Sequence, residues 1–118
     1  MLRTTALLLC FAATPAFAGD ALIEKATAAK SGDAWRFSVT IRHGDTGWDH
    51  YADAWRVVDQ EGGVYGTRIL HHPHENEQPF TRSLGGVSIP GDVDTVWIEA
   101  RDSVHGWNAD KLELSLPK

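Results

Sequence analysis

The stretch HHPH, residues 71–74, concentrates three of the six histidines of the chain in four positions. Pro73 disfavours the helical conformation at His72 and favours an extended one. Residues two apart in an extended chain project to the same side, with their Cα atoms about 6.6 Å apart. The spacing therefore predicts that His72 and His74 share a metal ion, while His71 points away from them.

The other three histidines lie in two stretches that are also rich in carboxylates. His43 and His50 bracket the sequence HGDTGWDH, and His105 follows Asp102 in DSVHGW. Neutral imidazole combined with carboxylate is ligand chemistry for copper(II) or zinc, and copper(II) binds more tightly in the general affinity order. We expect one of these ions to be bound by His43, His72 and His74, with His50, His71 and His105 as further candidate ligands.

Carboxylates near these histidines are expected to orient the ligands. Asp102 continues the inward face of its strand, so we expect it to accept a hydrogen bond from His43 and fix the tautomer of that ring. Asp45 and Glu75 are further candidates for this supporting role.

Several other interpretations of the same stretches stay open. The HHPH segment can be a solvated loop, or it can make ligand binding pH-dependent, because the unperturbed pKa of histidine is about 6.5. Calcium is a weaker alternative: Asp45, Asp49 and Asp53 recur every fourth residue, but Arg56 stands where an EF-hand needs its bidentate glutamate.

Aromatic residues in the same stretches suggest a function of another class. Trp48, Tyr51 and Trp107 could bind a protein or a glycan, which would make the chain an adhesion or assembly module, or they could be lids packed over the end of the fold. Arg82 is a further candidate contact residue, which we expect to form a surface ion pair with Glu75 or Asp102.

An enzymatic function receives no support from the motifs. Ser83 and Ser103 lack the Gly-x-Ser-x-Gly context of a nucleophile elbow, and the chain has no HExxH motif. The sequence favours a binding protein over an enzyme.

The elements that position these residues are predicted to be strands, because apolar and polar residues alternate in short runs between turn residues. In the stretch 34–43, for example, Trp35, Phe37 and Val39 alternate with polar residues. Gly106 to Asp110 is expected to be a turn. The predicted strands are 22–30, 34–43, 54–59, 64–70, 80–89, 93–104 and 112–116. The fold class is all-β: a seven-stranded antiparallel β-sandwich of the immunoglobulin or fibronectin type III kind.

This topology predicts that the histidines meet. Successive antiparallel strands end at opposite ends of a sandwich, so the loops after the second, fourth and sixth strands share one end. All six histidines lie in or beside those three loops. We therefore expect a ligand site at that end.

Two resemblances accompany this interpretation. The stretch TVWIEARDSVHGW is similar to the penultimate strand of fibronectin type III domains, which implies a β-sandwich. The stretches DTGWDHYAD, HPHENEQPFTR and ARDSVHGW resemble a family of small exported proteobacterial proteins without an assigned activity, which implies a single exported domain.

The N-terminus has the order of a secretory signal peptide: Arg3, an apolar run too short to span a bilayer, and the small-x-small pattern Ala16-Phe17-Ala18. We expect cleavage after Ala18, which leaves one domain, 19–118, in the periplasm or the medium. Cys10 would be lost with the signal, so the mature chain would contain no sulfur ligand.

The mature chain would have 10 basic and 16 acidic groups and a formal charge of −6. This charge disfavours nucleic acid and anionic membrane surfaces as partners. The partners that we expect are a metal ion, a small ligand or a periplasmic protein.

Overall fold

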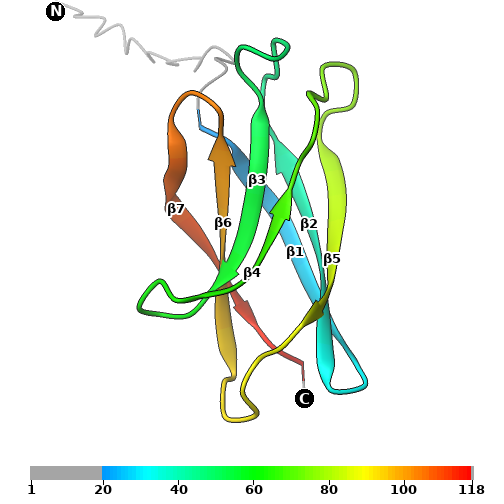
Figure 1. Ribbon diagram of the computed structural model, residues 1–118, viewed down its shortest axis with the longest axis vertical. Helices are drawn as coiled ribbons and strands as arrows, with labels where there is room; N and C mark the ends of the chain where they lie inside the picture. Colours follow the sequence, from blue (N-terminus) through cyan, green and yellow to red (C-terminus); the bar gives the residue numbers. More distant parts are fainter. Residues whose placement is uncertain (1–19, 118) are drawn as a thin grey trace, which may run out of the picture.

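The structure is a computed structural model that describes residues 20–117; the predicted signal peptide and Cys10 lie outside the described residues. Within that range the chain forms seven strands and no helix (Figure 1). The strands are β1 (Leu22–Ser31), β2 (Ala34–Arg42), β3 (Ala52–Val58), β4 (Val64–Ile69), β5 (Phe80–Val87), β6 (Thr95–Asp102) and β7 (Gly106–Ser115). The all-β prediction with seven antiparallel strands is confirmed.

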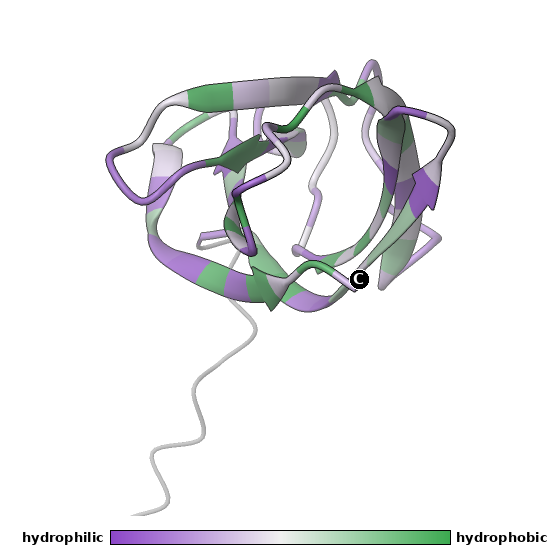
Figure 2. Ribbon diagram, turned by 90° about the horizontal axis from the view of Figure 1, so that it is seen from below, coloured by the Kyte–Doolittle hydropathy of each residue, from purple (hydrophilic) through white to green (hydrophobic). Residues whose placement is uncertain are grey.

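The strands divide into two sheets that enclose a common interior. One sheet has the order β1-β2-β5 and the other the order β4-β3-β6-β7, with antiparallel pairing throughout. Figure 2, seen along the long axis, shows the two layers around the interior. Phe37, Val39, Trp55, Val57 and Ile98 are fully buried between them, and each such side chain contributes about 1.5–3 kcal/mol by leaving water.

The alternation predicted for β2 is confirmed by the burial of its residues, and Asp102 lies on the inward face of β6 as expected, although Glu99 on the other face of β6 is also buried. The predicted turn at 106–110 is wrong. β7 already begins at Gly106, which pairs with Asp102 of β6. The chain reverses earlier, because the carboxylate of Asp102 accepts hydrogen bonds from the backbone N–H groups of Val104 and His105. Gly106 then completes the turn with a φ of 76°, a conformation that favours glycine.

The loops β2–β3, β4–β5 and β6–β7 lie at the same end of the sandwich, uppermost in Figure 1. Hydrogen bonds join them: the N–H of Ser103 donates to the carbonyl of Tyr51 at 2.9 Å, and the N–H of His74 donates to Asp45 Oδ2 at 2.7 Å. The prediction that these loops share one end is confirmed. We call residues 43–51, 70–79 and 102–105 together the histidine end.

Within residues 20–117, the structure contains no helix of the length and apolarity needed to cross a membrane.

Candidate metal centre

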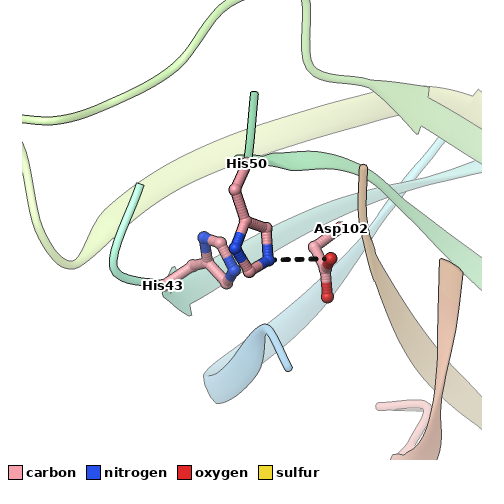
Figure 3. A group of neighbouring side chains, drawn as sticks. All are labelled: His43, His50 and Asp102. Atoms are coloured by element: carbon pink, nitrogen blue, oxygen red, sulfur yellow. Dashed lines mark hydrogen bonds and ion pairs between the residues drawn. The ribbon is translucent and has the colours of Figure 1, made fainter. Parts of the chain in front are cut away.

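The inward faces of β2 and β6 both end in polar residues, which close the apolar core at the histidine end. His43 follows β2 and is 3% exposed, and Asp102 ends β6 and is 1% exposed. His50, from the β2–β3 loop, is half-buried beside them. Each of these three residues offers a ligand atom within 4.8 Å of those of the other two (Figure 3).

A tight turn and a short stretch of pairing place His50 at this position. The N–H of Thr46 donates to the carbonyl of His50 at 3.0 Å, and the N–H of His50 donates to the carbonyl of Gly47 at 3.2 Å. Gly47 has a φ of 114°, which a side chain would strain. Two residues later, Ala52 pairs with Asp102 at the start of β3. The imidazole of His50 is therefore held over the end of β6.

Asp102 is the centre of the hydrogen-bond network. Its Oδ1 accepts hydrogen bonds from His50 Nε2 at 3.0 Å, from His105 Nδ1 at 3.0 Å, and from the backbone N–H groups of Val104 and His105. Burial by itself raises the pKa of Asp102, but the hydrogen bonds from Val104 and His105, together with the charge of His105, outweigh burial and the pKa is lowered overall. Asp102 is thus an anion at neutral pH.

His43 is oriented by Asp45, not by Asp102 as the sequence predicted. His43 Nδ1 lies 2.5 Å from Asp45 Oδ1, and Asp45 also accepts hydrogen bonds from the backbone N–H groups of Ala52 at 3.0 Å and His74 at 2.7 Å. The chain bends sharply after β2, with the N–H of Asp45 donating to the carbonyl of His43 at 2.8 Å. This bend brings the Asp45 carboxylate beside the ring.

The contact with Asp45 determines which nitrogen of His43 could bind a metal ion. A carboxylate accepts hydrogen bonds, so the contact with Asp45 favours the tautomer of His43 with its hydrogen on Nδ1, in which Nε2 would be the metal-binding nitrogen. Such carboxylate–histidine pairs are the usual support of metal-ligating histidines. The predicted supporting role of Asp45 therefore has a geometric basis.

The spacing of the three side chains fits an ion. Ligand atoms bound tetrahedrally at about 2.0–2.2 Å lie roughly 3.4 Å from one another. His50 Nε2 and Asp102 Oδ1 are 3.0 Å apart, and the whole group lies within 4.8 Å. A bound ion would require the separations of the ligand atoms to change by about 0.4 Å to at most about 1.4 Å, and it would replace the hydrogen bond between His50 and Asp102.

A second group shares Asp102 and includes a residue that the sequence did not reveal. Asp20, Asp102 and His105 also offer ligand atoms within 4.8 Å of one another, and Asp20 Oδ1 lies 3.9 Å from His105 Nδ1. Asp20 precedes β1 and reaches this end because β1 starts there. No local motif marks Asp20, so only the topology could identify it.

The HHPH segment lies on the other side of Asp45. Neither His72 nor His74 joins His43 in the metal-compatible groups found among residues 20–117. Instead the rings of His72 and His74 lie 4.7 Å apart, and the ring of His74 stacks on Phe80 at 4.1 Å. The structure thus divides the predicted ligands into His43, His50 and His105 around Asp102, and His72 with His74; His71 is exposed and joins neither group.

His74 is the buried member of the second pair. It is 6% exposed, and neither of its ring nitrogens has a hydrogen-bond partner in the structure. Burial lowers the pKa of His74, and the positive charges of Arg82 and His72 lower it further, against a smaller opposite effect of Asp45 and Glu77. The ring is therefore neutral at neutral pH.

Trp48 and Trp107 do not pack over the end of the fold as the lids that were one of the sequence-based alternatives. Trp48 is 68% exposed and contacts Tyr51 edge-on, with ring centroids 5.6 Å apart. Trp107 lies in β7, where the guanidinium of Arg56 stacks over its ring at 3.7 Å. Trp48 and Trp107 therefore have different surroundings, and Trp107 is occupied by an intramolecular contact.

Two further expectations need correction. Arg82 pairs with Glu77 at 2.9 Å, not with Glu75 or Asp102, and this pair joins the end of the β4–β5 loop to the start of β5. The carboxylates considered for calcium do not form a metal-compatible group within the described part of the chain. Asp53 instead pairs with Arg101 at 3.0 Å.

Comparisons with known proteins identify relatives without an assigned activity. No family model matches the chain. A protein of Halomicrobium mukohataei named "Putative lipoprotein" is 38% identical over 81 residues, which are 69% of this chain but only 39% of that relative. The crystal structure of a hypothetical protein from Pyrococcus horikoshii OT3 superposes with a TM-score of 0.53 at 14% identity, covering 84% of this chain and 88% of that one. This structural similarity shows a shared β-rich fold.

Proposed function

We propose that the protein is a small exported metal-binding protein whose site holds one divalent transition-metal ion between His43, His50 and Asp102. The observation that carries the proposal is the convergence of two imidazoles and one buried carboxylate, from three separate segments, within 4.8 Å. The backbone pairing between Ala52 and Asp102 holds two of these segments in register. The site would therefore be largely formed before the ion binds.

Each residue has a distinct role in this proposal. His43 would bind through Nε2 while Asp45 holds Nδ1, and His50 and Asp102 would exchange their mutual hydrogen bond for bonds to the ion. His105 would be the fourth ligand. Its ring already touches Asp102 and is 44% exposed, so it can turn toward the ion without disturbing the core.

Copper(II) or zinc is the proposed metal. Imidazole and carboxylate ligands suit both ions, and copper(II) leads the affinity order for sites of nitrogen and oxygen. Two histidines with one carboxylate are also the ligands of many non-haem iron(II) sites. Iron(II) therefore belongs in the same titration, and the fitted affinities would rank the three ions at this site.

The finer fold assignment and the location belong to the same proposal. The fourth strand pairs with the third and not with the fifth, which departs from the constant immunoglobulin type and supports the fibronectin type III arrangement.

The predicted signal peptide and the lipoprotein name of the archaeal relative support an exported or cell-envelope protein. We place the chain in the periplasm or the medium, in an exported family of the kind that its three stretches resemble.

Calorimetric titration of metal-free, untagged protein tests the proposal. At this centre wild-type protein should bind one equivalent of copper(II) or zinc tightly, and His50→Ala and Asp102→Asn should each weaken binding of that equivalent at least tenfold. His71→Ala is the matched control, because it removes an exposed histidine of the same end and should leave the affinity unchanged. Equal affinity in wild type, His50→Ala and Asp102→Asn would refute the site.

A second candidate function rests on Trp48. A tryptophan that is 68% exposed beside a polar groove is suited to stack on a sugar ring or to anchor in a partner protein. As an adhesion or assembly module, the protein would bind its partner in the presence of strong chelators. Metal binding at His43 and His50 would instead survive Trp48→Ala.

A further inference from the structure

The groove beside the HHPH segment is separate from the proposed metal centre. It has a volume of about 560 Å³, and its lining includes Trp48, His72, His74, Glu75, Glu77 and Arg82. Asp45 lies between the two places: its Oδ1 contacts the ring of His43, and its Oδ2 accepts the backbone N–H of His74.

The imidazole of His74 marks this groove as a binding site. The ring is more than nine-tenths buried, lines the groove, and has no hydrogen-bond partner for Nδ1 or Nε2 in the structure. An unsatisfied buried polar group carries a cost in folding free energy. A ligand that bonds to His74 from the groove would remove that cost.

The charges of the groove identify the class of ligand. Arg82 is already paired with Glu77 at 2.9 Å, so the guanidinium is a poor anchor for an added anion. Among the described residues, no ion pair is found for the carboxylate of Glu75. Two imidazoles with one available carboxylate favour a transition-metal cation over an anion.

We propose that His72, His74 and Glu75 form a second, solvent-accessible metal site, for which copper(II) is the best-suited ion. The rings of His72 and His74 are already 4.7 Å apart. His72, His74 and Glu75 do not form a preformed group among the described residues, and both ring nitrogens of His74 are buried. Binding therefore requires the exposed side chains of His72 and Glu75 to turn toward the ion, and the ring of His74 to move its edge toward the groove along the face of Phe80. Water from the open groove would complete the coordination.

This second site is independent of the first proposal, and one set of variants separates the two. Copper(II) titration of the untagged protein by calorimetry and electron paramagnetic resonance should give two equivalents and two spectral components in wild type. The double variant His72→Ala, His74→Phe should lose one equivalent, and its phenylalanine preserves the stacking on Phe80. His71→Ala is the matched control and should retain both.

The outcomes divide clearly. Both sites are supported if the His72→Ala, His74→Phe variant loses only the copper(II) ion of the groove and His50→Ala loses only the ion of the first centre. Unchanged stoichiometry in the His72, His74 variant overturns the groove site and leaves the first centre standing. Loss of both equivalents in His50→Ala also overturns it as an independent site. If His74→Phe prevents folding, the exposed pair His72→Ala, Glu75→Gln gives the same test.

Discussion

Replacing Asp45 by asparagine removes the carboxylate that orients His43 but leaves His43, the proposed metal ligand, in place. The carboxylate is buried and accepts three hydrogen bonds: from His43 Nδ1 and the N–H of Ala52 at Oδ1, and from the N–H of His74 at Oδ2. Asparagine has the same size but only one oxygen, so at least one buried donor must face the amide NH₂ group whichever way the amide turns.

The structure gives the size of both effects. One unsatisfied buried donor costs about 1–3 kcal/mol of unfolding free energy, which lowers the Tm of a domain of roughly 100 residues by about 4–20 °C. Without the anionic acceptor, His43 loses the partner that keeps the hydrogen on Nδ1, and metal affinity should fall about 10- to 100-fold. Urea denaturation of metal-free protein and calorimetric titration measure the two quantities.

The matched control is Asp49→Asn, which removes an exposed carboxylate of the same loop and should change neither quantity. An Asp45→Asn protein that is less stable but binds the metal within twofold of wild type would refute the reasoning. Asp45 would then serve only to join the loops of the histidine end.

Three further predictions concern stability and the rival function. Because the pKa of His74 is lowered below its usual 6.5 in the folded protein, the unfolded chain takes up a proton first as the pH falls through 6.5, so the folded state loses stability there. Urea denaturation of chelator-treated protein between pH 7.5 and 5 should show this loss in wild type and less of it in His74→Phe; equal slopes would contradict it. Arg56→Ala should cost about 2 kcal/mol, because the buried carboxylate of Glu99 loses its partner at 2.8 Å and keeps only Lys111 at 3.5 Å, and because a tryptophan ring loses its cation. Arg42→Ala, in an exposed pair, should cost less than about 1 kcal/mol in the same denaturation assay, and the reverse order would argue against this assignment. Trp48→Ala should change the unfolding free energy by no more than about 0.5 kcal/mol, so any loss of glycan or protein binding in a pull-down assay could be attributed to the contact itself.

The strands of this protein could be predicted because their signal is local. Alternation with period two places Phe37, Val39 and Ile41 on one face of β2 whatever the rest of the chain does, and continuing the same count places His43 at the end of that face. The same counting identified Asp102 as the inward end of β6. Chain direction then placed the three loops at one end.

The partners within the site could not be predicted in the same way. Counting residues gave no reason to prefer Asp45 over Asp102 as the partner of His43, because the choice depends on a bend directly after β2. The start of β7 at Gly106 likewise depends on the hydrogen bonds that Asp102 accepts inside the turn. Side chains in loops do not alternate regularly as they do in strands, so the conformation of a loop leaves no comparable pattern in the sequence.

The sequence by itself therefore determined the number and order of the strands, most of the inward residues and the gathering of all six histidines at one end, because each follows from side-chain alternation and chain direction. Only the tertiary structure decided that Asp102 collects His50 and His105, that Asp20 joins them from the start of β1, and that His72 and His74 lie apart on the far side of Asp45. Those distances are set by contacts between segments far apart in the chain, and such contacts exist only once the two sheets have packed.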